Sequence, residues 1–153
     1  MALLSFVDSA PRAYRLKAGN AYLTFSTSTG TSPDDLLWTK RAWSGWSAYA
    51  ESKLCDVLLA FAAARRWKNV RSNALEPGWV STKMGGPSAP DDLRQGYVTQ
   101  AWLATSEDTL AQSTGGYFYH QRPRTPNTIA NDVGIQEELL AECGRISGIP
   151  LTD

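Results

Sequence analysis

The stretch that decides the fold is residues 47–68, SAYAESKLCDVLLAFAAARRWK. Its apolar side chains recur every three or four positions along one face, and they are Ala50, Leu54, Val57, Leu58 and Phe61. Ser44 and Ser47 are both candidate N-caps, because a serine oxygen can accept from the first free amides of a helix. Basic residues close the stretch, where the helix dipole favours cations. The sequence therefore predicts one long helix with a buried face.

Short segments predicted to form strands lie on both sides of this helix, and the first of them is rich in aromatic and β-branched residues. They are residues 21–27, 70–75 and 115–119, and each is typical of a strand. Helical patterns over 91–104 and 135–146 follow the second and third of these segments. Strands that alternate with helices predict an α/β fold with a parallel sheet.

Length and composition limit the class of protein. The chain has 153 residues, the size of one domain, and it is 42% hydrophobic and 20% charged, so we expect a packed core. Fifteen basic residues balance fifteen acidic ones, which argues against a nucleic-acid partner and against an electrostatic membrane anchor. Two cysteines are too few for a disulfide scaffold, and no apolar run is long enough for a membrane span. We expect a cytoplasmic protein.

Several common catalytic sequence motifs are absent. The chain has no phosphate-binding loop of the Gly-x-x-x-x-Gly-Lys type, no His-Glu-x-x-His zinc motif and no Cys-x-x-Cys. Its one histidine, His120, follows the third predicted strand. A Ser-His-Asp triad would have to use this residue, and a surface histidine at a strand end is the simpler interpretation. We predict no metal site.

The informative pair is Tyr49 and Lys53, which are four positions apart on the strongest helix and so share one face. A free tyrosine titrates near pH ~10, and an ammonium close by lowers that pKa by about 1–3 units. A phenol tuned in this way can donate a proton to a carbonyl or accept one from an alcohol, while a cofactor supplies the hydride. A solvated helix face without chemistry is the alternative that the pair alone leaves open.

The segments around the pair carry two further features. The first strand ends in a hydroxyl cluster, Ser26-Thr27-Ser28-Thr29-Gly30, at the sheet edge where open α/β folds bind ligands. The second strand ends in Glu76-Pro77-Gly78-Trp79-Val80-Ser81-Thr82, in which Pro-Gly turns the chain sharply and exposes backbone groups.

Along the chain, the hydroxyl cluster is followed by the Tyr49–Lys53 pair and then by the Pro-Gly turn. A sequence with these three features in this order resembles the short-chain dehydrogenase/reductase superfamily. The resemblance covers nearly the whole chain, as the family's second half, and the aromatic loop over 34–46 resembles the retinol-dehydrogenase-like members. It implies the C-terminal half of a Rossmann-like doubly wound parallel sheet, with about three strands and flanking helices. It also implies an oxidoreductase that interconverts a small-molecule carbonyl and an alcohol.

The resemblance assigns a role to each site residue. Tyr49 is the general acid/base, and Lys53 lowers its pKa and hydrogen-bonds the nicotinamide ribose. The hydroxyl that polarises the substrate carbonyl falls on Thr27, with Ser28 as the alternative.

The cofactor implied by the resemblance is NAD or NADP, held at its nicotinamide end by the turn after the second strand. Pro77 and Gly78 form that turn, and Val80 and Thr82 lie at the carboxamide. Tyr49 and Lys53 complete the cofactor contacts.

The family's glycine-rich pyrophosphate turn has no counterpart in residues 1–20. We therefore expect residues 1–153 to form a single partial Rossmann-like domain that lacks the N-terminal dinucleotide-binding half. An unpaired edge of the first strand would favour a homo-oligomer. Two hypotheses follow. One is an enzyme acting through Tyr49 and Lys53. The other is a truncated, catalytically silent fragment that serves as an interaction module through the aromatic loop over 34–46, which is its tryptophan-rich loop.

Overall fold

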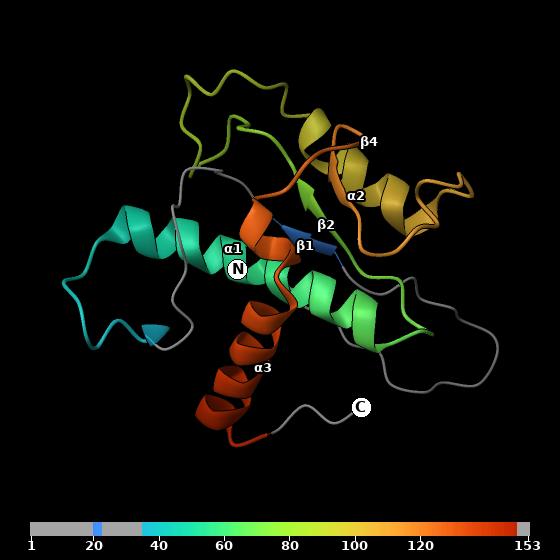
Figure 1. The fold of residues 1–153 in the computed structure, drawn as a ribbon. Helices are drawn as coiled ribbons and strands as arrows, with labels where there is room; N and C mark the ends of the chain where they lie inside the picture. Colours follow the sequence, from blue (N-terminus) through green and yellow to red (C-terminus); the bar gives the residue numbers. More distant parts are fainter. Residues whose placement is uncertain (1–19, 23–34, 150–153) are drawn as a thin grey trace.

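The structure, a computed structural model, describes residues 20–22 and 35–149 (Figure 1). In this part of the chain the sheet has the order β1-β2-β3-β4. Strands β1 (Asn20–Tyr22), β2 (Asn73–Glu76) and β3 (Tyr117–Tyr119) run parallel. A two-residue strand, β4 (Arg122–Pro123), pairs antiparallel with β3. The predicted α/β fold with about three parallel strands is confirmed, and β4 is an addition that the sequence pattern did not indicate.

The long helix α1 spans Gly45–Arg66, so it begins two residues earlier than the sequence predicted. Ser44 is its N-cap, and its Oγ accepts from the backbone amide of Ser47 at 3.4 Å. Trp67 is its C-cap, and β2 begins at Asn73.

Two more α-helices and one short 3-10 helix complete the elements. Helix α2 spans Gln95–Thr105, η2 spans Thr128–Asn131 and α3 spans Val133–Ser147. Asp132 caps α3 by accepting from the amide of Ile135, and Gly148, with φ of 72°, ends it in the left-handed conformation that glycine adopts without strain. Of the predicted first strand, residues 23–27 lie outside the described residues.

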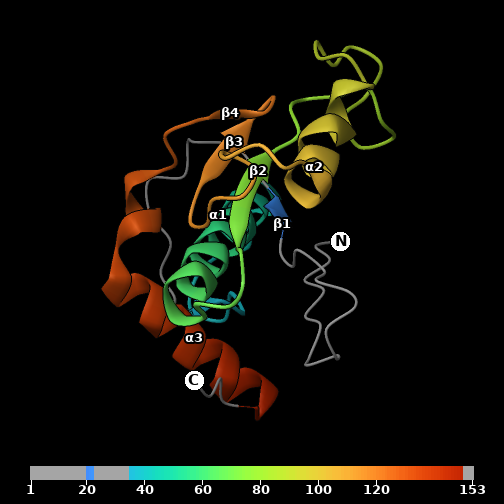
Figure 2. The same ribbon diagram turned by 90° about the vertical axis from the view of Figure 1, so that its right-hand side faces the viewer.

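The sheet is covered on both faces by helices, as Figure 2 shows. Ala74 of β2 and Tyr117 of β3 face α1, and they join one core cluster with Leu54, Val57 and Leu58. Their sequence neighbours point the other way, because successive side chains of a strand alternate between faces. Leu75 and Phe118 pack against Leu103 and Trp102 of α2. This two-sided burial is the doubly wound arrangement.

The two crossover connections have opposite hands. The step from β1 to β2 and the step from β2 to β3 go in the same direction across the sheet. Their helices, α1 and α2, nevertheless lie on opposite faces. Parallel crossovers are right-handed in about 98% of cases, so one of these two is an exception to a strong rule.

Helix α3 packs against α1 on the outer side of the sheet. Glu137 of α3 accepts hydrogen bonds from both Arg65 and Arg66 at the C-terminal end of α1. Gln136 is buried beside them and donates to the carbonyl of Ala130 at 2.8 Å. No helix among residues 35–149 is long and apolar enough to cross a membrane.

Candidate active site

The direction of α1 brings its N-terminal end to the carboxyl edge of the sheet. A helix that connects two parallel strands must run back toward the start of the second one. Close packing confirms this direction at the far end, because a Cβ on Gly115, just before β3, would lie 3.7 Å from Ala64 in the last turns of α1. The first turns of α1 therefore lie on the side of the sheet where open α/β folds bind ligands.

Tyr49 and Lys53 lie on one side of these first turns, and both side chains are half-buried. The Nζ atom of Lys53 is 5.9 Å from the centroid of the Tyr49 ring. At this distance the ammonium is attracted to the electron-rich face of the ring. The helical spacing thus yields the proximity that the sequence indicated.

A third residue, Asp56, belongs to this group although the sequence reasoning missed it. Its Oδ2 accepts a hydrogen bond from Nζ of Lys53 at 3.0 Å. Burial raises the pKa of Asp56 above its usual value, and the neighbouring Lys53 partly opposes that rise. The signal was present in the sequence, because an acidic residue three positions after a lysine lies on the same helix face.

The turn after β2 adopts a conformation that requires glycine. Gly78 has φ of 85°, in the left-handed region, and a Cβ built there would lie 2.7 Å from Oδ2 of Asp91. The same carboxylate oxygen accepts from the backbone amide of Trp79 at 2.5 Å. The amide of Asp91 in turn donates to the carbonyl of Trp79 at 3.0 Å. Asp91 therefore fixes the turn from the far end of a long loop. No local sequence pattern predicts this contact.

The next residues form a tight local network. Val80 pairs with Asp91 in an isolated parallel bridge, and its carbonyl accepts from the amide of Thr82 at 2.8 Å. The Thr82 hydroxyl accepts from the amide of Gly85 at 3.0 Å, and the Thr82 carbonyl accepts from the amide of Gly86. The segment from Pro77 to Thr82 is thus an ordered turn with an exposed Thr82 side chain.

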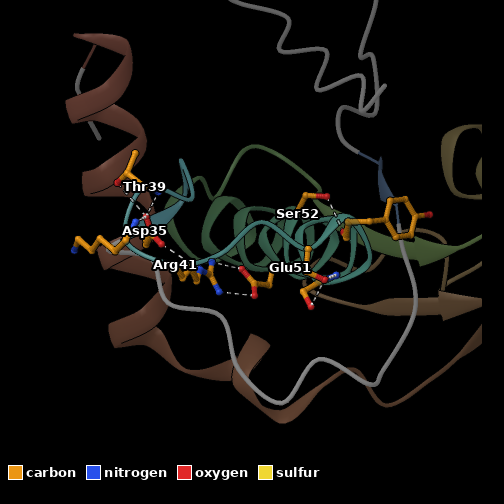
Figure 3. A network of polar contacts seen from close by, with 9 residues as sticks. Asp35, Thr39, Arg41, Glu51 and Ser52 are labelled. Atoms are coloured by element: carbon orange, nitrogen blue, oxygen red, sulfur yellow. Dashed lines mark hydrogen bonds and ion pairs between the residues drawn. The ribbon is translucent and has the colours of Figure 1, made fainter.

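The tryptophan-rich loop is fastened to α1 by Arg41, as Figure 3 shows. The guanidinium forms a two-pronged contact with Glu51 of α1, at 2.8 and 2.5 Å, and its Nε donates to Asp35 at 3.1 Å. Asp35 is buried and also accepts from the amide of Thr39. Burial would raise the pKa of Asp35, but these hydrogen bonds outweigh it and lower the pKa. The guanidinium also stacks 3.9 Å from the ring of Trp38.

His120 differs from its prediction as a surface histidine. Its ring is half-buried and stacks on Tyr119 with centroids 3.9 Å apart. Its Nε2 atom is buried without a hydrogen-bond partner among the described residues. The backbone has φ of 47°, which tightens the turn between β3 and β4. Packing against Tyr119 explains the position of the ring.

Two of the residues singled out from the sequence, Thr27 and Ser28, lie outside the described residues. The others fall on two elements, Tyr49 and Lys53 on α1 and the Pro77 to Thr82 turn after β2. Among residues 35–149, no three histidine, cysteine or acidic side chains are arranged to hold a metal ion.

Comparison with known proteins identifies relatives of this architecture. No protein-family model matches the chain. The chain is 36% identical over 125 residues to a short-chain dehydrogenase, chry4, of Gibberella zeae. It is 30% identical over 139 residues to retinol dehydrogenase 13 of Homo sapiens. The two alignments cover 79% and 76% of this chain. The chain belongs to the short-chain dehydrogenase/reductase superfamily.

This short-chain dehydrogenase/reductase chain spans less than half the length of both relatives, 48% of the first and 41% of the second. A crystal structure of an uncharacterized protein from Mycobacterium paratuberculosis has the same fold, with a TM-score of 0.63 over 80% of this chain and 46% of that chain. The two sequences are 21% identical, so this likeness concerns the fold. The family expected from the sequence is confirmed.

Proposed function

We propose that this chain carries the hydride-end half of an NAD(P)-dependent oxidoreductase site that interconverts a carbonyl and an alcohol. The observation that supports it is the half-buried Lys53 ammonium, 5.9 Å from the ring centroid of Tyr49, at the ligand-binding edge of the sheet. A phenol beside a fixed ammonium is suited to proton transfer at a carbonyl oxygen.

The proposed roles follow from the chemistry of each side chain. The hydroxyl of Tyr49 donates a proton to the carbonyl oxygen in reduction and accepts it back in oxidation. Lys53 stabilises the phenolate form of Tyr49. One of the three N–H donors of Lys53 is directed to Asp56, and the others suit the hydroxyls of a ribose. The hydroxyl of Thr27, or alternatively that of Ser28, holds the carbonyl oxygen.

NAD or NADP, when bound, would supply or receive the hydride. The residues after β2 offer an ordered backbone to a flat polar ring, because the left-handed Gly78 turns the chain and Asp91 fixes that turn. Val80 and Thr82, next along this turn, are suited to a carboxamide. The chain thus contributes a lysine and an ordered turn to the cofactor, and residues 1–153 act as one partial Rossmann-like domain.

Binding and turnover test this proposal separately. NADH and NADPH are titrated against the purified chain, with cofactor fluorescence as the readout. Activity is then assayed with small aromatic and aliphatic aldehydes and ketones. Tyr49→Phe keeps the ring and the packing but removes the hydroxyl. We expect it to retain cofactor binding and to lose turnover by about 10²–10⁴-fold.

The proposal fails if Tyr49→Phe turns over substrate as fast as the unchanged chain. Ser52→Ala is the matched control, because Ser52 is exposed on α1 and its hydroxyl bonds only the Tyr49 carbonyl among the contacts described. It should leave both binding and turnover near their original values.

A second candidate function is supported by exposed apolar side chains at the start of α1. Trp43 and Trp46 are 72% and 62% exposed, and Leu37, earlier in the same loop, is 62% exposed. Exposed aromatic residues are typical of surfaces that bind other proteins. A catalytically silent interaction module would show no fluorescence change with either cofactor at millimolar concentration, and the same titration therefore separates the two functions.

A further inference from the structure

Asp56 lies one turn beyond Lys53 on α1, and no role has been given to it above. Its Oδ2 is 3.0 Å from Nζ of Lys53, and the two side chains are only 14% and 17% exposed. On the other side of Lys53 along the helix lies the ring of Tyr49, 5.9 Å from the same nitrogen. One ammonium is therefore held between a carboxylate and a phenol.

The effect of a cation on a phenol depends on whether that cation is already paired. An uncompensated ammonium within about 4–6 Å of a phenolate stabilises it strongly. An ammonium paired with a carboxylate acts as a dipole, and its two charges partly cancel at the phenol. Because the Lys53–Asp56 pair is largely buried, water and salt screen it less than a surface pair. The hydrogen bond from Nζ to Oδ2 of Asp56 also fixes the position of the ammonium, so that loss of the carboxylate frees Lys53 to approach Tyr49 more closely. The carboxylate therefore weakens the influence of Lys53 on Tyr49 both through its charge and through the position in which it holds the ammonium.

We propose that Asp56 is a positioning residue for Lys53 and sets the pH at which the Tyr49 phenol gives up its proton. The inference rests on the proposed function of Tyr49. Compared with an unpaired lysine, the paired one lets the phenol keep its proton to a higher pH. Asp56 thereby widens the pH range in which Tyr49 can donate a proton to a carbonyl, which is the reductive direction.

The surroundings of the pair make the carboxylate a specific partner. Among the described residues, Lys53 is the one charged group that shifts the pKa of Asp56. Burial opposes ionisation of Asp56, so its charge depends on the contact with Lys53. Glu51 lies nearby in sequence, but its carboxylate is bound to Arg41. Asp56 is therefore the acidic group that can hold the ammonium.

The experiment follows the ionisation of Tyr49 without cofactor or turnover. Ultraviolet absorbance of tyrosinate is recorded against pH for the chain and for Tyr49→Phe, and the difference isolates Tyr49 from the other five tyrosines. In Asp56→Asn we expect the midpoint to fall by about 0.5–1 pH unit, because the ammonium is no longer neutralised. Asp56→Glu keeps the charge and should restore most of the original midpoint.

Two further variants separate this role from general effects of charge. Asp92→Asn makes the same chemical change at an exposed aspartate paired with Arg94, and it should leave the midpoint unchanged. In a Lys53→Met background, Asp56→Asn should shift the midpoint by much less than it does when Lys53 is present. An equal shift with and without Lys53 would show that Asp56 acts only through its own charge, and the proposal would be wrong.

The same variants distinguish this inference from the proposed function. An unchanged midpoint in Asp56→Asn, with an upward shift in Lys53→Met, would overturn the role of Asp56 and leave the catalytic proposal standing. A lowered midpoint in Asp56→Asn supports the coupling even if Tyr49→Phe proves to have no effect on turnover. In the reductase assay, Asp56→Asn should move the alkaline fall of kcat to lower pH by the same amount, with cofactor KM altered less.

Discussion

Gly78 shows at the scale of a single residue how the backbone shapes the candidate site. Its φ of 85° and the 2.7 Å gap between a built Cβ and Oδ2 of Asp91 both exclude a larger side chain. We expect Gly78→Ala to lower the free energy of unfolding by about 1–3 kcal/mol, because strain and a displaced carboxylate add together. Urea unfolding followed by circular dichroism measures the change.

Gly86→Ala is the matched control for that variant. Gly86 also has a positive φ, 78°, but nothing lies within 4 Å of its built Cβ. It should therefore cost about 1 kcal/mol, for the backbone strain alone. Equal losses for the two glycines would mean that the contact with Asp91 contributes nothing to the turn.

The individual residues divide into those that local spacing predicts and those that it does not. The positions of Tyr49 and Lys53 on one face followed from their separation on a helix, because helix geometry is regular. Asp91 could not be found in this way, since it reaches Trp79 across a loop whose path depends on tertiary packing. The hydroxyls of Thr27 and Ser28 stay predictions.

At the scale of elements, Arg41 joins the tryptophan-rich loop to α1. It binds Glu51 on the helix and Asp35 at the start of the loop. Arg41→Met keeps the length of the side chain but leaves two carboxylates without their cation. We expect the loop to loosen, with a change in tryptophan fluorescence and faster proteolysis between residues 35 and 44.

Arg94→Met provides the comparison for the loop. Arg94 also pairs with an aspartate, Asp92, but its side chain is 83% exposed. Exposed pairs contribute little, so neither fluorescence nor the cleavage rate should change. If Arg41→Met also leaves the fluorescence and the cleavage rate unchanged, the ion pairs of Arg41 do not hold the loop.

Glu137 makes the contact between α1 and α3 dependent on pH. The hydrogen bond from Arg65, together with the charge of Arg66, lowers the pKa of Glu137 below its usual value of 4.5. A lowered pKa in the folded state means that this stabilisation is present above pH 4.5 and is lost as the pH falls through the folded pKa. We expect the free energy of unfolding to fall over that window.

Glu137→Gln tests this dependence. The glutamine cannot ionise, so the part of the acid-side fall that belongs to Glu137 should disappear from urea unfolding measured at a series of pH values. The raised pKa of Asp56 acts with the opposite sign, because its stabilisation is present at low pH and is lost as the pH rises through its folded pKa. The test is therefore the difference in the free energy of unfolding between Glu137→Gln and the unchanged chain at each pH. Either curve alone would also contain the contribution of Asp56.

The elements themselves were predicted best where the pattern was longest. The apolar stripe of α1 is buried as expected, and the helix bounds differ by two residues at each end. Strand β4 was missed because two residues give no periodicity. Helix α2 begins later than expected, at Gln95, because Asp92 accepts from the amide of Arg94 and forms a local turn first.

At the scale of the whole molecule, stability depends on the core between α1 and the sheet. Leu58 is completely buried there. Leu58→Ala should cost about 2–5 kcal/mol, from lost burial and the cavity left behind. Leu110→Ala removes the same atoms from a side chain that is 50% exposed, and thermal unfolding should show a much smaller loss. If Leu58→Ala and Leu110→Ala lost similar stability, the core between α1 and the sheet would not be the main source of stability.

The alternation of strands and helices predicted the sheet, but it could not predict on which face each helix lies. General experience favours right-handed connections throughout, which would put α1 and α2 on the same face. The distribution of side chains decides otherwise, since Ala74 and Leu75 each find a helical partner on their own side. Both neighbours are apolar, so a pattern of alternation could not reveal that both faces are covered.

Because α1 and α2 lie on opposite faces of the sheet, β2 is covered on both faces as well as paired at both edges. It is hydrogen-bonded to β1 and β3 at its two edges and covered by a helix on each face. Water can reach its amides only when the surrounding elements separate together. In deuterium oxide, the backbone amides of Ala74 and Leu75 should therefore be among the last to exchange their hydrogens. Their exchange rate then reports how often the whole molecule unfolds.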